Sequence, residues 1–210
     1  MELILRLTTS LSDLIGKPLI WASRSLGVWV LFTKDLFVWT FKPAFHYKQL
    51  FQQMEFVGVK SVWIVSLTAF FSGAVFALQS GKVFALFNTE IMVGATVGLS
   101  LTREIAPVFA ALMVTARACS AMAAELGSMK VTEQIDAMTT MAVEPMQYLV
   151  VPRVWATTLM MPLLTMVFNF IGMIGAYVVG IHLLSISKGP FLNKLYYLVD
   201  GDDIFGGLVK

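Results

Sequence analysis

Three long apolar runs constrain the fold of this chain more than any other feature of its sequence. Residues 61–78 and 154–181 carry no charged side chain, and residues 91–126 carry only four. A helix of about 20 mostly apolar residues is long enough to cross the hydrocarbon core of a bilayer. The composition agrees, since 13% of the 210 residues are charged, against about 25% in a typical soluble domain. We therefore predict an all-α integral membrane protein with about three transmembrane helices.

The middle run is too long for a single membrane crossing. As one helix, residues 91–126 would extend about 54 Å at 1.5 Å per residue, whereas the hydrocarbon core is roughly 30 Å thick. The helix must therefore project into water at one end or be broken along its length. Pro107 marks the place where we expect a kink, because proline removes a backbone hydrogen bond and clashes with the preceding turn.

Residues 1–50 form a separate region ahead of the first apolar run. Residues 21–47 are dense in Trp and Phe, and Arg24, Lys34 and Lys42 recur among them. Aromatic side chains at headgroup depth, with basic groups toward lipid phosphates, are typical of an interfacial helix. We favour this interpretation over a fourth span, because Lys34 and the aspartate after it interrupt the segment.

Lysine and arginine counts predict the orientation of the spans. The first 60 residues contain seven of these basic residues, whereas the loop after the first run contains Lys82 alone. By the positive-inside rule the N-terminus is cytoplasmic. Three spans then place residues 128–153 in the cytoplasm and residues 182–210 on the outer side.

The composition gives no indication of nucleic-acid binding or of a metal site. The net charge is only +2, and the single cysteine, Cys119, belongs to no pattern of metal ligands. No G-x-x-x-x-G-K-[ST] motif for nucleotide binding occurs either. We therefore expect no catalytic residue, metal or cofactor in this chain.

Arg103, Glu104 and Pro107 place a charged pair and a freed backbone carbonyl within one turn of an apolar helix. Charges within the bilayer are costly, by about 2.5 kcal/mol or more each, and they usually face a cavity or a partner. Adjacent residues point about 100° apart on a helix, so each charge needs its own partner. We predict a polar patch that lines a substrate cavity. The alternative is a pair that snorkels to the outer headgroups.

Arg117 lies deeper in the same run, among small side chains. Ala116, Ser120 and Ala124 follow one another at a spacing of four residues. Small residues at this spacing let helices approach closely in membranes. We therefore predict that this face packs within the helix bundle or against a second copy of the chain. Arg117 is expected to bind a carboxylate, such as Glu125 or one on the second copy.

The loop of residues 128–153 follows a predicted helix end at Gly127. It contains a short amphipathic helix that Thr132 is expected to cap at its N-terminus. Such a helix could rest on the membrane surface, or it could fill a groove on a cytoplasmic partner. The residues available for such a contact are the cap, two acids and two apolar anchors: Thr132, Glu133, Ile135, Asp136 and Met138.

Residues 94–156 closely resemble the MlaE-type permeases of ABC transporters. The resemblance rests mainly on three motifs, which are R-E-x-x-P from Arg103 to Pro107, A-R-A-x-S-A-x-A-A-E-x-G from Ala116 to Gly127, and T-E-Q at residues 132–134. It implies a permease of the bacterial inner membrane that pairs as a homodimer and carries phospholipid or a related lipid.

The resemblance also implies partners and residue roles. The family works with a separate cytoplasmic ATPase, which hydrolyses the ATP, and with an MCE-domain protein. Its coupling helix corresponds to residues 132–142, and its cavity charges correspond to Arg103 and Glu104. An N-terminal interfacial helix is also a family feature. Because the family normally has about five spans, we expect residues 1–210 to form a single permease domain that lacks its C-terminal part.

Two other functions remain compatible with the residues alone. The chain could be a secondary transporter in which Glu104 carries protons, or a membrane scaffold that transports nothing. A proton carrier would work without an ATPase, and a scaffold would tolerate the loss of Arg103 and Glu104.

Overall fold

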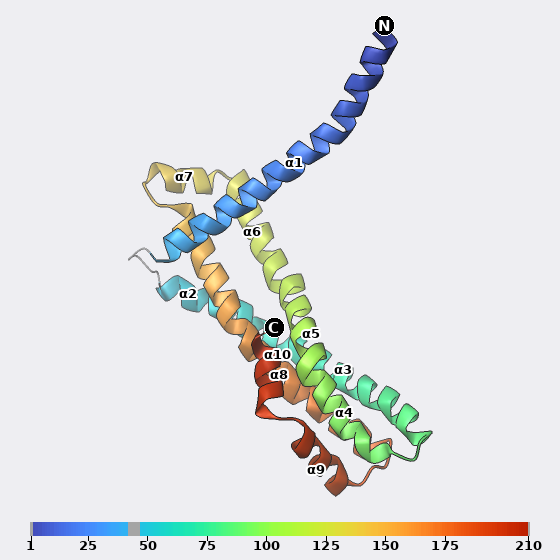
Figure 1. The fold of residues 1–210 in the computed structure, drawn as a ribbon. Helices are drawn as coiled ribbons and strands as arrows, with labels where there is room; N and C mark the ends of the chain where they lie inside the picture. The colour runs from blue at the N-terminus through green and yellow to red at the C-terminus, as the bar shows by residue number, and fades with distance from the viewer. Residues whose placement is uncertain (1, 42–46, 210) are drawn as a thin grey trace.

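A computed structural model describes residues 2–41 and 47–209, and all regular structure within them is helical (Figure 1). Three helices among these residues are long and apolar enough to cross a membrane: Tyr47–Ala85, Glu90–Val131 and Met146–His182. The prediction of an all-α membrane protein with three spans is therefore confirmed. Each of these helices is longer than the apolar run from which it was predicted.

Each span consists of several helical segments that follow one another directly. The first contains α2 (Tyr47–Met54), the π-helix η1 (Glu55–Val59) and α3 (Lys60–Ala85). The second contains η2 (Glu90–Met92), α4 (Val93–Ser100), η3 (Leu101–Ile105), α5 (Ala106–Val114), η4 (Thr115–Cys119) and α6 (Ser120–Val131). The third contains η5 (Met146–Val150) and α8 (Val151–His182). The remaining helices are α1 (Glu2–Thr40), α7 (Gln134–Thr140), α9 (Lys188–Leu198) and α10 (Gly201–Val209).

The second span stays helical through Pro107 and is not broken there. Proline has no backbone N–H, so the carbonyl of Arg103 lacks its usual partner four residues later. The chain adapts with the π-helix η3 immediately before α5, in which the N–H of Ala106 donates to the carbonyl of Leu101. The 42 residues of this span would extend about 63 Å at 1.5 Å per residue. The helix is therefore longer than the membrane core is thick, and Figure 1 shows its C-terminal part, α6, running toward α7.

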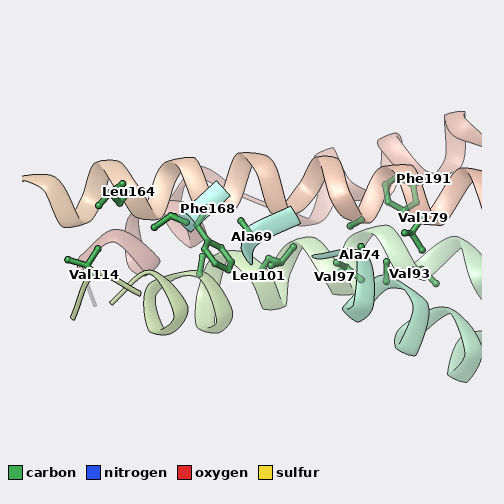
Figure 2. Close-up of a cluster of buried hydrophobic side chains, with 14 of the residues drawn as sticks. Ala69, Ala74, Val93, Val97, Leu101, Val114, Leu164, Phe168, Val179 and Phe191 are labelled. Atoms are coloured by element: carbon green, nitrogen blue, oxygen red, sulfur yellow. The ribbon is translucent and has the colours of Figure 1, made fainter. Parts of the chain in front are cut away.

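The core of the molecule is the parallel contact between α3 and α8, in which Gly58 meets Met160, Gly73 meets Gly172 and Gly81 meets Leu184. A Cβ atom added at Gly73 would collide with the carbonyl oxygen of Gly172, and one added at Gly175 would collide with that of Phe70. The two backbones therefore touch, which is the way that small residues bring membrane helices together. The fully buried side chains of Leu101 and Phe168 lie against this contact, in the cluster shown in Figure 2.

Helix α9 is fixed to this core by one aromatic side chain. Phe191 is buried and lies between α4 and α8, where Gly94 and Gly180 leave room for its ring. A Cβ at Gly94 would lie 2.9 Å from that ring, and one at Gly180 would lie 3.0 Å from it. Phe191 also packs edge-on against Tyr177, with 5.9 Å between the ring centres. Helix α9 is thus held against the end of the bundle.

Helix α1 extends away from the other helices and is not one of the three candidate spans in the described part of the chain (Figure 1). Large apolar side chains such as Leu19, Trp21 and Trp29 are exposed on it. Near its C-terminal end, the Trp155 indole N–H donates to the hydroxyl of Thr40 over 3.3 Å and links α1 to α8. The interfacial placement of residues 1–50 stays a prediction, and residues 42–46 lie outside the described residues.

The backbone contact between α3 and α8 predicts that Gly73→Ala destabilises the protein. The added methyl group must displace the α8 backbone, and overpacking of this kind costs about 1–3 kcal/mol. Thermal unfolding in detergent should show a lower transition temperature. Gly27→Ala is the matched control, because a Cβ there meets nothing within 4 Å. Equal transition temperatures for the two variants would contradict the close contact.

Candidate functional site

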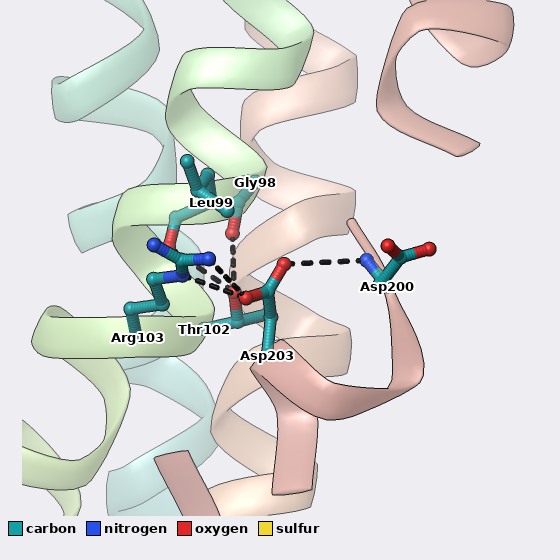
Figure 3. Close-up of polar contacts among 6 residues, drawn as sticks. All are labelled: Gly98, Leu99, Thr102, Arg103, Asp200 and Asp203. Carbon is teal, nitrogen blue, oxygen red and sulfur yellow. Dashed lines mark hydrogen bonds and ion pairs between the residues drawn. The ribbon is translucent and has the colours of Figure 1, made fainter. Parts of the chain in front are cut away.

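The predicted polar patch is held by an ion pair with the C-terminal helix. The Arg103 Nε donates to Oδ1 of Asp203 over 2.7 Å, and Asp203 lies in α10 (Figure 3). The Asp203 side chain is only 11% exposed, whereas that of Arg103 is 55% exposed. Arg103 therefore has one face turned to a carboxylate and another open to its surroundings.

The backbone fixes both partners of this pair. Helix α10 lies directly on η3, since a Cβ at Gly207 would collide with the carbonyl oxygen of Thr102. Thr102 is buried, and its hydroxyl donates to the Gly98 carbonyl over 3.0 Å. The backbone N–H of Asp200 donates to Oδ2 of Asp203 over 3.3 Å. This pairing could not be predicted, because Asp203 lies 100 residues from Arg103 and outside the apolar runs.

The other two residues of the predicted patch lie in the same part of the second span. Glu104 is exposed, next to Arg103 in η3. Pro107 is half-buried in the first turn of α5. The helix therefore places these three residues together, with the two charged side chains at the surface of the single chain.

Arg117 has partners other than the predicted Glu125. Its Nη1 donates to the Phe56 carbonyl over 3.2 Å and to the Ser61 hydroxyl over 2.8 Å. Its guanidinium also lies over the Phe56 ring, 5.6 Å from the ring centre. The predicted pairing of Arg117 with Glu125 is wrong, because eight residues along a helix separate the two by about 12 Å. Glu125 instead pairs with Arg153, with 2.9 Å between Oε2 and Nη2.

Arg117 and its backbone partner Phe56 both lie in π-helical segments. Phe56 lies within η1, and Arg117 lies within the π-helix η4 of the second span. In a bilayer, backbone N–H and C=O groups that lack a regular helical hydrogen bond must find a partner inside the protein. Arg117 donates a hydrogen bond to the Phe56 carbonyl and so connects the first two spans at their π-helical segments.

The small-residue face is open in the single chain. Ala116, Ser120 and Ala124 are all exposed, and α6 packs closely only on η4 and α7 among the described elements. The packing of this face against a second copy stays a prediction.

The inner loop contains a shorter helix than predicted, and two predictions about its start are wrong. Helix α6 continues through Gly127 to Val131, because Gly127 keeps helical geometry and does not end the helix. Thr132 closes α6, and its hydroxyl donates back to the Ser128 carbonyl over 2.8 Å. The residue that precedes α7 is Glu133, in a left-handed conformation with φ 58°.

The predicted contact residues of the loop lie on and beside α7. Ile135 and Met138 are half-buried, and Glu133 is exposed. Asp136 forms an ion pair with Lys130 at 2.8 Å, and both side chains are more than half exposed. Among residues 2–41 and 47–209, no three His, Cys, Asp or Glu side chains are grouped so that they could hold a metal ion.

Long apolar helices with arginines anchored inside them are typical of a multi-pass membrane protein with a polar path between its spans. The family model described as "Permease MlaE" matches residues 50–210, and the chain belongs to this family.

Named relatives agree with the family match. A "Probable ABC transporter permease protein" of Rickettsia typhi is 39% identical over 201 residues, which are 96% of this chain and 78% of the relative. A protein of the same description from Synechocystis is 38% identical over 91% of this chain and 72% of its own length. The "Intermembrane phospholipid transport system permease protein MlaE" of Haemophilus influenzae is 39% identical over 79% of this chain and 64% of its own length.

The hydrogen bonds of Arg117 predict that Arg117→Ala destabilises the protein. Ser61 is fully buried, and leaving such a group without its partner costs about 1–3 kcal/mol. The variant should unfold at a lower temperature and accumulate less in membranes. Lys60→Ala is the control, since Lys60 lies over the same Phe56 ring at 5.6 Å but is exposed. A variant without Arg117 that is as stable as the control would contradict this structural role.

Proposed function

We propose that the chain is the membrane-spanning subunit of an ABC transporter that moves phospholipid or a related lipid between the bacterial inner membrane and the cell envelope. The observation that carries this proposal is the match of residues 50–210 to the MlaE permease family, together with a relative named for phospholipid transport. A separate cytoplasmic ATPase supplies the energy, and an MCE-domain protein exchanges the lipid on the outer side.

In the proposed transporter, Arg103 contacts the lipid phosphate. Its side chain is 55% exposed, so a phosphate can reach the guanidinium beside Asp203. Charge-assisted contacts between arginine and phosphate are short and strong. Because Asp203 already holds Arg103, the lipid would compete with this carboxylate, and α10 would respond to lipid binding. Glu104 would pair with a basic group from another helix or from the MCE-domain protein.

The proposed function also assigns contact surfaces for the ATPase and for a second copy of the chain. In the proposed orientation the N-terminus is cytoplasmic, so α7 would face the ATPase, with Ile135 and Met138 as its apolar anchors. The exposed small-residue face of Ala116, Ser120 and Ala124 is suited to close packing against a second copy. The lipid cavity would then lie at the centre of a homodimer.

Arg103→Ala is expected to reduce lipid transport by roughly ten-fold or more, because a charge-assisted contact is worth about 1.5–3 kcal/mol. The complex should still assemble, since α10 is also held on η3 by the backbone contact between Gly207 and Thr102. Asp203→Asn should act in the opposite direction and increase the lipid that co-purifies, because it removes the competing carboxylate. Both effects can be measured as phospholipid bound and moved by the complete complex. If Arg103→Ala moves lipid at the unaltered rate, the charges only snorkel to the headgroups.

Changing Ile135 and Met138 together to Asp is expected to release the ATPase from the membrane. Two charges would replace the apolar anchors and oppose their burial in the ATPase groove. The measurement is the amount of ATPase recovered with the purified permease. The matched control changes Thr139 and Thr140 to Asp, which adds the same charge on exposed positions of α7. Equal recovery in both double variants would place the docking surface elsewhere.

A further inference from the structure

The ion pair between Glu125 and Arg153 has no role in the function described so far. Glu125 lies in α6, before the inner loop, and Arg153 lies in the first turn of α8, after it. Their side chains meet at 2.9 Å, between Oε2 and Nη2. The pair therefore closes the base of the loop that carries α7.

Arg153 is unusually dependent on this one carboxylate. Its side chain is 7% exposed, whereas that of Glu125 is 55% exposed. The Nε and Nη1 atoms of Arg153 are buried and have no hydrogen-bond partner among the described residues. A buried cation with so few partners is strongly destabilised when its counter-charge is lost. Glu125 thus keeps α6 at the position where it can neutralise Arg153.

Few other contacts hold α6 in place. Among the described elements, α6 packs closely only on η4 and α7, its neighbours along the chain. Its Met122 side chain reaches the buried cluster, but α6 and α8 make little close backbone contact. By contrast, α8 packs along α3 through the glycine contact. The ion pair therefore connects a loosely packed helix, with α7 at its end, to the rigid pair of spans.

We infer that Glu125 and Arg153 are positioning residues that transmit the movement of α7 to the membrane spans. The inference rests on the proposed function, in which the ATPase binds α7. When the ATPase displaces α7, α6 moves with it, because only Thr132 and Glu133 separate the two helices. The ion pair carries this displacement to the start of α8, and through α8 to α3.

The test is the lipid moved per ATP hydrolysed by the complete transporter in proteoliposomes. The variant combines Glu125→Gln with Arg153→Met, which removes both charges and leaves no buried cation behind. The matched control combines Glu144→Gln with Lys130→Met, which removes one charge of each sign from exposed positions of the same loop, outside the predicted ATPase contact. Permease content and recovered ATPase are measured for each sample, because a merely structural role would change those amounts and leave the ratio unaltered.

The coupling role predicts that the Glu125–Arg153 variant keeps its ATPase but moves less lipid per ATP. The expected reduction is about 5-fold or more, which is a typical factor for coupling between two sites. The control should keep the original ratio. An unaltered ratio in the first variant overturns the inference, and so does an equal loss in both. If the first variant does not accumulate, Glu125→Asp replaces it. This change keeps the charge and shortens its reach, and it should lower the ratio; an unaltered ratio again overturns the inference.

The unaltered transporter separates this inference from the proposed function. If the native complex hydrolyses ATP without moving phospholipid, the proposed function fails, whatever the variants do. If the native complex moves lipid and the ratio does not depend on the ion pair, only the inference fails.

Discussion

The close contact between α3 and α8 is the interaction on which the rest of the structure depends. Lipid chains are as apolar as leucine, so burial of apolar surface does little to hold membrane helices together, and close packing must do it. Gly73, Gly172 and Gly175 remove the side chains that would keep the two backbones apart. The second span then packs on this pair, and Phe191 fixes α9 in the space that Gly94 and Gly180 leave open.

Three arginines then connect segments that are distant along the chain. Arg117 joins the second span to the first through the Phe56 carbonyl and Ser61. Arg103 joins the same span to α10 through Asp203, and Arg153 joins α8 to α6 through Glu125. Charges and released backbone groups cannot remain unpaired in a bilayer. These arginines are therefore contacts between elements, and the most exposed of the three, Arg103, is the one that we propose for contact with a lipid phosphate.

The sequence was sufficient to predict the spans, because the thickness of the bilayer fixes the length of an apolar helix. It also placed Arg103, Glu104 and Pro107 on one turn. The partners of the arginines were not predictable, because they depend on how helices 28 to 100 residues apart pack together. Helices α9 and α10 were missed because neither is long enough to give a span signal. Gly127 misled the prediction, because a glycine that keeps helical geometry in the middle of α6 resembles a helix end in sequence.

The most direct test of the proposed function is to measure which energy source drives lipid transfer. The purified permease would be reconstituted in proteoliposomes with fluorescent phospholipid, with and without its ATPase, and lipid transfer would be measured with ATP or with an imposed proton gradient. The account predicts transfer that requires both the ATPase and ATP hydrolysis and that does not respond to the gradient. Transfer driven by the proton gradient in the absence of the ATPase would contradict it, and would identify Glu104 as a candidate proton carrier.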